Sequence, residues 1–323
     1  MFTQGISMYK NIRATVQILF SELFSIGLFL WVLGWLARMI YGDRLSTIAL
    51  FYPANRRYIE SVTFPWYARR VKWRPTFGGF FATSKGCGFI FAIGALEEEF
   101  CDANNIGHLL AVHESMEKLA SRLGVPSVAY SGVLPSVLAR TGISREPIEL
   151  VRTAHWIVEA AETVRQKCGL PIDCPIVVLG AAGYLGKRVV SLILESNAQQ
   201  EVIEIDPAHS DPLCRGQEVL DQLRGCPVLL INISRRDVLE RYIDSLWDGV
   251  VVLNEVYPEC SQEGIEQIKV IGARYFHIQG VKAWSVPRFP GAYKGAVPCC
   301  AASAANAIGL NGLYEAQLKL LEK

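Results

Sequence analysis

Three glycines, Gly180, Gly183 and Gly186, are the residues of this sequence whose type and spacing point most directly to chemistry. The β-branched run Ile176–Leu179 precedes them, and an amphipathic helical pattern follows. In a strand–turn–helix unit, such glycines let the backbone approach a pyrophosphate, and the unpaired amides of the helix N-terminus meet its charge. The pattern therefore predicts a dinucleotide site; a turn with only a structural role is the alternative. The predicted contacts are Gly180, Ala181, Gly183, Tyr184, Leu185 and Gly186.

An acidic residue follows at the expected distance. The strand-like run from Glu201 to Ile205 ends at Asp206, twenty residues past Gly186. A carboxylate there is placed to accept hydrogen bonds from the adenine-ribose diol and to repel a 2′-phosphate. The expected cofactor is therefore NAD or NADP, and Asp206 favours NAD.

The elements that must position this turn alternate between apolar runs and helical patterns. Further apolar runs at 227–233 and 249–253 are separated by helix-like stretches, which predicts a parallel sheet covered on both faces. The fold class is thus α/β: a doubly wound parallel Rossmann sheet with a second, smaller α/β domain and an N-terminal hydrophobic helix. The expected boundaries are a membrane-associating segment at 1–78, a substrate domain at 79–168, the dinucleotide domain at 169–297, and a C-terminal helix at 298–323 that packs across the cleft.

Three residues are candidates for catalysis. Cys300 follows Pro298 at the start of a helix-forming stretch, where the helix dipole would stabilise a thiolate nucleophile. Glu255 and Tyr257 follow the run 249–253 at its carboxyl end, the edge that faces the ligand crevice in open α/β sheets. Each has a structural alternative: a small buried thiol for Cys300, and a role in holding the loop for Glu255 and Tyr257.

Composition excludes several classes of site. The nine cysteines are scattered without a Cys-x-x-Cys pair, so neither a zinc site nor a disulfide framework is expected, and a reducing compartment is the simplest interpretation. The sequence therefore predicts no metal site. A net charge of +1 provides no general attraction for nucleic acid.

The N-terminal region is the compositional outlier. Residues 23–37 carry no charge, and the segment 18–41 has the length of a bilayer span but includes Glu22 and Arg38. From Arg38 to Arg74, eight basic residues stand against Asp43 and Glu60, with aromatic residues interleaved. This predicts association with a lipid bilayer, with the catalytic domains on the cytoplasmic side. A solvated face over a core and a nucleic-acid patch are the alternatives, and spanning is not distinguished from lying within one leaflet.

Four short segments carry a resemblance to a known family. They are 114–124 with 131–137, 153–161 with the glycine turn, 252–258, and Cys300 followed by Ala-Ala-Ser-Ala. Together they resemble the long-chain fatty acyl-(acyl-carrier-protein) reductases, and more distantly the shikimate-dehydrogenase-like two-domain fold. The resemblance implies that Cys300 accepts an acyl group from an acyl carrier protein or coenzyme A thioester. Two features depart from that family: the N-terminal hydrophobic segment, and Asp206 where NADPH would be expected.

The leading hypothesis is a membrane-associated NAD(P)-dependent oxidoreductase that reduces a long-chain acyl thioester to an aldehyde through a Cys300 thioester. One alternative is an NAD(P)-dependent dehydrogenase of a small hydroxy or amino acid without a covalent step. Another is a non-catalytic NAD(P)-binding sensor or scaffold at the membrane. A homo-oligomer is a further expectation, and nucleic acid is not an expected partner.

Overall fold

The chain divides into two compact units in the computed structural model. One unit comprises Met1–Glu149 and Val281–Gln317, and the other comprises Leu150–Gly280 and Leu318–Lys323. The structure describes residues 2–23, 27–53, 55–56, 59, 63–84, 86–144, 148–206, 216–289, 295–303 and 318–322. This division differs from the predicted boundaries in two ways. The first unit includes residues before 79, and it also includes a second segment that begins at Val281.

A five-stranded mixed sheet forms the centre of the first unit, in the order β10-β2-β3-β1-β4. The strand β1 is parallel to β3 and β4, whereas β2 is antiparallel to β3 and to β10. The strands are β1 (Leu45–Phe51), β2 (Thr76–Ala82), β3 (Cys87–Ala92), β4 (Ser127–Tyr130) and β10 (Trp284–Val286).

The strands β1 and β2 correct the prediction that residues 1–78 stand apart as a membrane-associating segment. All residues of β1 except Phe51 are buried, and the strand lies between β3 and β4. Its partners are distant in the sequence, so no local pattern reveals that it is a central strand. In β2, Gly79 lets β10 approach: a Cβ there would lie 2.1 Å from the Val286 carbonyl oxygen.

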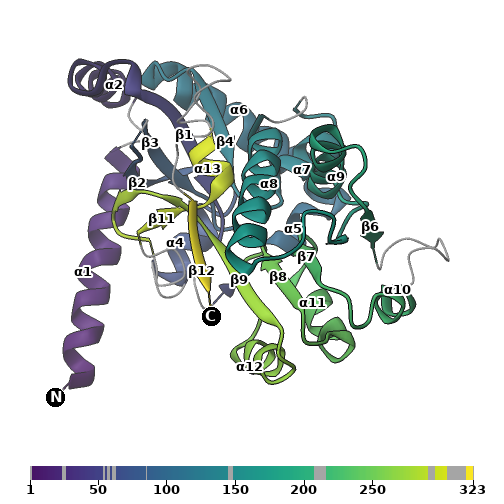
Figure 1. Cartoon of the computed structure of the whole chain (residues 1–323). Coiled ribbons are helices and arrows are strands. Elements are labelled where there is room, and N and C mark those ends of the chain that lie inside the picture. The colour runs from purple at the N-terminus through teal and green to yellow at the C-terminus, as the bar shows by residue number, and fades with distance from the viewer. Residues whose placement is uncertain are drawn as a thin grey trace. The chain divides into compact units, whose positions relative to one another are not determined.

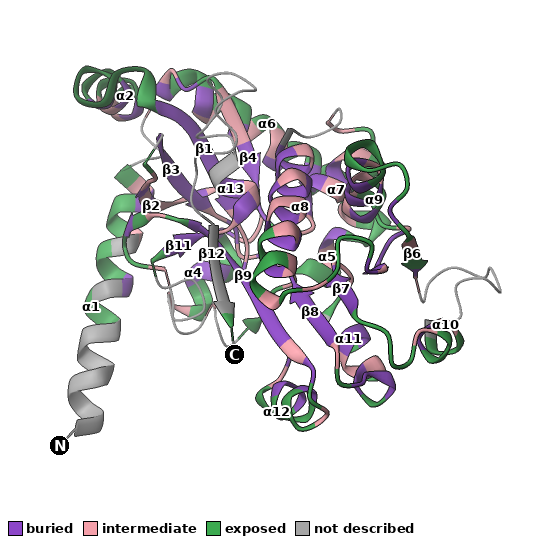
Figure 2. Cartoon of the chain, in the orientation of Figure 1, coloured by how far each residue is buried: buried purple, intermediate pink, exposed green. Residues whose placement is uncertain are grey.

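Two helices replace the single predicted N-terminal helix: α1 (Phe2–Leu23) and α2 (Gly27–Tyr41). Figure 2 shows that much of the described surface of both is exposed, while the strands are largely buried. Among the described residues, no single helix has the length and apolar character to cross a bilayer. One bent pair, Ala14–Leu23 with Gly27–Arg44 at 96°, meets that test only when taken together.

The remaining helices of the first unit surround its sheet. They are α4 (Pro65–Arg70), α5 (Glu97–Phe100), α6 (Ile106–Leu123), α7 (Leu134–Arg140) and α13 (Cys299–Ser303). The helix α6 ends at Gly124, which adopts the left-handed conformation (φ +65°). Contacts with α6 hold α2 in place: a Cβ on Gly34 would lie 2.3 Å from the Leu123 carbonyl oxygen, so only glycine allows this approach.

The basic and aromatic region after α2 is largely built into the first unit. Tyr67 is buried, and the Trp73 ring stacks on His108 with centroids 5.2 Å apart. Lys72 pairs with Glu99, and the Arg74 guanidinium lies 2.8 Å from the Glu22 carboxylate. These residues match the alternative of a solvated face over a core.

A predominantly parallel sheet with the order β11-β9-β8-β7-β5-β6 organises the second unit (Figure 1). The strands are β5 (Ile176–Leu179), β6 (Val202–Ile205), β7 (Val228–Asn232), β8 (Val250–Asn254) and β9 (Arg274–Lys282). The sheet also includes β11 (Ala296–Val297), whose residues belong to the first unit and which pairs antiparallel with Val281 and Lys282 at the end of β9. Every residue of β5, β7 and β8 is buried, which requires cover on both faces. The helices are α8 (Ile148–Cys168), α9 (Tyr184–Ser196), α10 (Gly216–Gln222), α11 (Arg236–Tyr242) and α12 (Gln262–Val270). The predicted parallel α/β sheet is confirmed.

The chain ends in a strand rather than a helix. The described part of the predicted C-terminal helix is α13, of five residues, whereas Leu318–Glu322 forms β12 beside β9. Residues 304–317 of that prediction lie outside the described residues. The Glu322 carboxylate pairs with Arg274 on β9 and lies 2.7 Å from the Lys167 ammonium, so partners distant in sequence hold this strand. The prediction of a helix is therefore wrong at 318–322.

Candidate functional site

The glycine turn of the second unit has the geometry that its spacing predicts. Gly180 has φ +96°, and a Cβ on it would lie 2.8 Å from the Ser234 amide nitrogen. A Cβ on Gly186 would lie 2.1 Å from the Gly180 carbonyl oxygen, so the helix could not pack on the turn with any larger residue. Gly183 is less constrained, with its nearest neighbour at 3.1 Å.

The helix after the turn presents its N-terminus without a side-chain cap. Gly183 is the N-cap residue of α9, which runs for 13 residues over β5 and β6. The Gly183 amide donates to the Gly180 carbonyl at 3.1 Å, and Tyr184, which begins the helix, is exposed. Because a glycine N-cap offers no acceptor, the amides of the first turn suit an external anion.

Asp206 lies beside this turn, at the end of β6. One of its carboxylate oxygens accepts a hydrogen bond from the Ala182 amide at 3.1 Å. The residue is half-buried. The Asp206 carboxylate thus stabilises the glycine turn, a role that its spacing from Gly186 did not reveal.

The strand order places the turn at the switch point of the sheet. The first strand of the unit, β5, pairs with β6 on one side and β7 on the other, all in parallel. Where the order reverses, the loops after neighbouring strands diverge and leave a crevice at their carboxyl ends. The residues on this edge are those of the glycine turn, Ser234 after β7 and Glu255 after β8.

A row of buried polar side chains crosses the same edge and was missed by the sequence analysis. Asn232, Asn254 and His277 lie opposite one another on β7, β8 and β9. Asn232 Nδ2 donates to Asn254 Oδ1 at 2.7 Å, and Asn254 Nδ2 lies 3.0 Å from His277 Nδ1. The only signal available in the sequence was an Asn or His within or closing each of three apolar runs.

This polar row fixes the loops that follow the strands. Asn232 Oδ1 accepts from the Ser234 amide at 3.2 Å, and the Asn232 carbonyl accepts from the Glu255 amide at 3.1 Å. Asn254 Nδ2 also donates to the Val256 carbonyl at 2.9 Å. The row therefore positions the backbone at two residues that face the crevice edge.

Glu255 and Tyr257, the predicted catalytic residues of this unit, lie just beyond β8. Glu255 is half-buried, and burial raises the pKa of its carboxyl to about 7. Tyr257 is 37% exposed, and its partial burial, followed by the charge of Glu259, raises the pKa of its hydroxyl. A carboxyl that titrates near neutrality can both take up and release a proton under physiological conditions.

A second constellation lies in the first unit, around Tyr52 just after β1. Its hydroxyl accepts a hydrogen bond from the Val133 amide at 3.1 Å and donates to Glu97 Oε2 at 3.4 Å. Burial, and next the charge of Glu97, raise the Tyr52 pKa far above its usual range, while the bond from Val133 opposes them. The phenol thus stays protonated and remains a hydrogen-bond donor.

Cys300 belongs to this constellation. It is half-buried on α13, which contacts β1 and β4, and its charge is one of the causes that raise the Tyr52 pKa. Cys299, its neighbour, is buried. With five described residues, α13 is too short to support the predicted helix-dipole argument for the thiolate. Tyr52 was missed because nothing in its sequence surroundings marks it.

No group of three or more His, Cys, Asp or Glu side chains within the described part of the chain is arranged to hold a metal ion. The candidate catalytic residues therefore divide between the units: Cys300 and Tyr52 in the first, Glu255 and Tyr257 in the second.

Comparisons with known proteins add little. No protein-family model and no curated protein matches the sequence. Among solved structures, L-tryptophan dehydrogenase from Nostoc punctiforme is similar at 14% identity, covering 72% of this chain and 68% of that one, with a TM-score of 0.32. Shikimate 5-dehydrogenase from Listeria monocytogenes, in complex with shikimate and NAD, is similar at 11% identity, covering 73% and 87%, with a TM-score of 0.36. Scores this low support no transfer of activity to this chain.

Proposed function

We propose that the protein is a nicotinamide-dependent oxidoreductase. The observation that carries this proposal is the Gly180–Gly186 turn at the switch point of the sheet, with a glycine N-cap on α9 and Asp206 beside it. These residues suit a pyrophosphate at the helix N-terminus and a ribose diol at the acid. NAD is preferred over NADP, because the Asp206 carboxylate repels a 2′-phosphate. The cofactor would supply hydride transfer.

Titration of the full-length protein with NADH and NADPH, followed by calorimetry, tests this cofactor assignment. Tighter binding of NADH is expected, and Asp206→Asn should narrow the difference by removing the repulsive charge. The glutamate on the exposed side of β6 provides a matched control, Glu204→Gln, which should leave the preference unchanged. If neither NADH nor NADPH released or absorbed heat on titration, the oxidoreductase assignment would be rejected.

The reaction that we propose is reduction of an acyl thioester to an aldehyde. The Cys300 thiolate attacks the acyl carbon, and the donor thiol of coenzyme A or an acyl carrier protein leaves with a proton. One hydride and one proton then convert the enzyme thioester into an aldehyde and the free Cys300 thiol. Tyr52 stays protonated and interacts electrostatically with Cys300, so its O–H would turn from its 3.4 Å bond with Glu97 to the carbonyl oxygen as negative charge develops there.

Covalent labelling tests the role of Cys300. Incubation with a radiolabelled long-chain acyl-coenzyme A is expected to label the wild type and Cys299→Ser, but not Cys300→Ser. The adjacent Cys299 is a matched control because it is buried on the same helix. Equal labelling of the wild type and Cys300→Ser would exclude the thioester.

A dehydrogenase of a small hydroxy or amino acid is the second candidate. The observation that favours it is Glu255, whose carboxyl pKa of about 7 suits proton transfer to or from a hydroxyl or amine. This candidate needs no covalent step, so turnover of such an acid that survives Cys300→Ser and is lost in Glu255→Gln would support it over the acyl reductase.

We further propose that the protein attaches to the cytoplasmic face of a lipid bilayer through the outer side of α2. Gly34 on the inner side is held against α6, whereas the outer side exposes large apolar residues at helical spacing. These are Leu28, Trp31, Val32, Trp35, Leu36, Met39 and Ile40. Tryptophan favours the level of the lipid headgroups, so the helix would lie along one leaflet.

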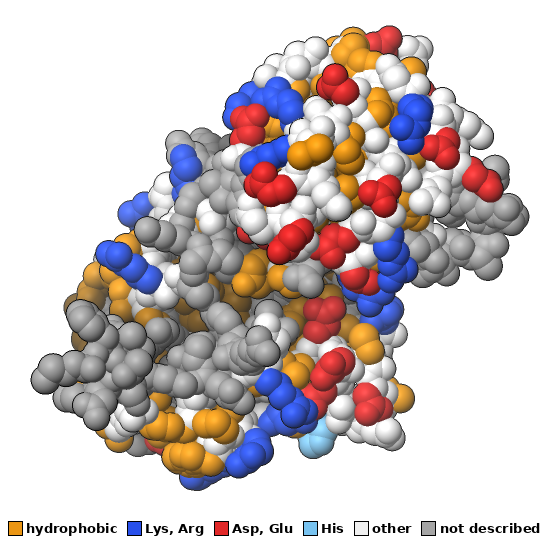
Figure 3. All heavy atoms as spheres, turned by 90° about the horizontal axis from the view of Figure 1, so that it is seen from below, with side chains coloured by type: hydrophobic (Ala, Val, Ile, Leu, Met, Phe, Trp, Pro, Cys, Tyr) orange, Lys and Arg blue, Asp and Glu red, His pale blue; other side chains and the backbone are white. Residues whose placement is uncertain are grey.

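Pelleting with anionic vesicles tests this attachment. The double variant Trp31→Ser/Trp35→Ser should lose most of the bound fraction, whereas Trp284→Ser, which removes a comparably exposed tryptophan from β10, should not. Nucleic acid is not proposed as a partner. On the face drawn in Figure 3, basic side chains of the described residues are interspersed with acidic ones rather than aligned in a track.

A further inference from the structure

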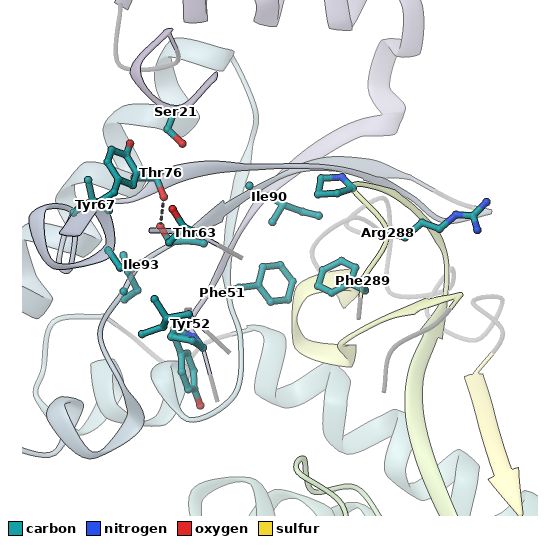
Figure 4. Close-up of a pocket in the computed structure, with 18 residues that line it drawn as sticks. Ser21, Phe51, Tyr52, Thr63, Tyr67, Thr76, Ile90, Ile93, Arg288 and Phe289 are labelled. Carbon is teal, nitrogen blue, oxygen red and sulfur yellow. Dashed lines mark hydrogen bonds between the residues drawn. The ribbon is translucent and has the colours of Figure 1, made fainter. Parts of the chain in front are cut away.

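We propose that a cavity within the first unit binds the alkyl tail of the substrate and directs its reactive end towards Tyr52. The cavity has a volume of ≈ 160 Å³ and is lined from the sheet, from α4 and from the segment after β10. This proposal names the substrate class of the proposed oxidoreductase and rests on that function. Figure 4 shows the cavity and the side chains around it.

Small residues on one face of the sheet create the hollow. Thr76 and Gly78 on β2, and Ile90 and Ala92 on β3, all line the cavity. The register of β2 shifts between Phe77 and Gly79, and Gly78 lies against Ile90, where a Cβ would be 3.0 Å from Ile90 Cγ2. Of these four, only Ile90 carries a large side chain. The opposite side is covered by Tyr67, Ala68 and Val71, on and just after α4. Phe89 and Phe91, which alternate with Ile90 and Ala92, belong instead to the hydrophobic core.

Three polar side chains of the lining are already engaged with the protein. Thr76 Oγ1 donates to the Ala92 carbonyl at 2.9 Å, Ser21 Oγ donates to the Phe77 carbonyl at 3.3 Å, and the Tyr67 hydroxyl donates to Glu22 at 3.2 Å. Arg288, the one charged side chain in the described lining, points away from the cavity in Figure 4. A polar ligand would lose hydration without gaining partners, whereas a hydrocarbon loses nothing.

Tyr52 defines the end of the cavity at which chemistry would occur. Tyr52 is part of the lining, its hydroxyl accepts a hydrogen bond from the Val133 amide, and it interacts electrostatically with Cys300. Beside it, the rings of Phe51 and Phe289 are in contact with centroids 5.1 Å apart (Figure 4). A tail held between these rings and the sheet would place its carbonyl near the Tyr52 hydroxyl.

The other end of the cavity reaches α1. Ser21 contributes to the lining, and its neighbours Leu19, Phe20 and Leu23 are exposed apolar residues. An alkyl chain that leaves a lipid phase would thus meet apolar surface before it reaches the cavity.

The volume sets the length of chain that the cavity encloses. Since an apolar cavity of about 150 Å³ accommodates benzene, this one encloses about six carbon atoms, and a longer chain would extend out of it. Each buried methylene contributes about 0.8 kcal/mol, which corresponds to about a fourfold gain in affinity.

Displacement of a fluorescent fatty acid from the full-length protein by unbranched fatty acids of increasing length tests the proposal. Affinity should rise about fourfold per methylene until the cavity is filled, and then level off. The variant Ala92→Phe fills the cavity from β3, so it should weaken binding at least tenfold and move the plateau to shorter acids. The same substitution at Ala82, at the end of β2 and outside the lining, should change neither.

If thermal melting shows that Ala92→Phe does not fold, a variant that enlarges the cavity tests the proposal instead. Ile90→Ala should move the plateau to longer acids. Affinity that does not depend on chain length, or that responds equally to Ala92→Phe and Ala82→Phe, would overturn the proposal. Binding of the fatty acid needs no cofactor, so titrating the same preparation with NADH separates the two proposals. A protein that binds fatty acids but not NADH would reject only the oxidoreductase assignment. A protein that binds NADH but not fatty acids would reject only the proposed tail-binding cavity.

Discussion

The Tyr52 hydroxyl occupies the space that a side chain on residue 132 would need. A Cβ on Gly132 would lie 2.2 Å from the Tyr52 hydroxyl oxygen, and the backbone of Gly132 has φ +59°. The next residue, Val133, donates its amide to the same hydroxyl. The loop after β4 is therefore shaped around a phenol from the end of β1, and this contact fixes the position of the Tyr52 hydroxyl.

Gly132→Ala is expected to lower the free energy of unfolding by about 2–4 kcal/mol, because a left-handed backbone costs about 1–2 kcal/mol and the contact with Tyr52 adds an overpacking penalty. Urea denaturation measures the loss. Gly142→Ala is the control, since Gly142 has φ +72° but no atom within 4 Å of a Cβ, so it should show the backbone cost alone. Equal losses in the two variants would mean that Tyr52 does not constrain the loop.

Two of the three glycines at the α9 turn, Gly183 and Gly186, should respond differently to alanine. Gly186→Ala places a Cβ 2.1 Å from a backbone oxygen and should destabilise the second unit by about 3 kcal/mol or more. Gly183→Ala meets its nearest atom at 3.1 Å, so it should fold, while its methyl group at the exposed turn weakens NADH binding about tenfold. Thermal melting and calorimetry separate the two effects. Normal NADH affinity in Gly183→Ala would argue that the pyrophosphate lies elsewhere.

Local sequence was sufficient where the determinants of structure are themselves local. The sequence indicates the glycine turn, Asp206 after β6, and the helices α6 and α8. Their signals are glycine spacing, apolar periodicity and a C-cap glycine, each contained within one or two elements. The candidate residues Glu255 and Tyr257 were found for the same reason, since they follow a recognisable strand.

Sequence reasoning failed where distant partners decide the structure. Leu45–Phe51 became a central strand because β3 and β4 flank it, and Leu318–Glu322 became a strand because it pairs with β9. Tyr52 and the Asn232–Asn254–His277 row gain their roles only through residues 22 to 81 positions away. Such contacts have no signature in a single sequence.

The polar row should show strong coupling between its members. Asn254→Leu removes the oxygen that accepts from Asn232 Nδ2, whereas His277 Nδ1 keeps the Asn254 main-chain carbonyl at 3.1 Å. The free energy of unfolding should therefore fall by about 1–3 kcal/mol. Adding Asn232→Leu should cost much less than it does alone, because the unpaired amide is removed. Urea denaturation of the two single variants and the double variant gives the coupling. Additive losses would show that the side chains act independently.

Glu255 should make the stability of the second unit depend on pH. Burial raises the pKa of its carboxyl to about 7 from an ordinary value of 4.5. A pKa raised by folding contributes stability that is fully present below the unfolded value and is lost as the pH rises through the folded value. The free energy of unfolding should therefore decrease between pH 4.5 and 7, by about 1–3 kcal/mol for a half-buried group.

Glu255→Gln removes this titration, so its stability should exceed that of the wild type above pH 7 and lose the advantage near pH 4.5. Urea denaturation at the two pH values gives the difference, and Glu263→Gln, an exposed change on α12, should follow the wild-type curve. A Gln variant that tracks the wild type at both pH values would show that the Glu255 carboxylate remains hydrated. Glu255 would then lose its claim to a proton-transfer role at neutral pH, and with it the second candidate function would lose its specific support.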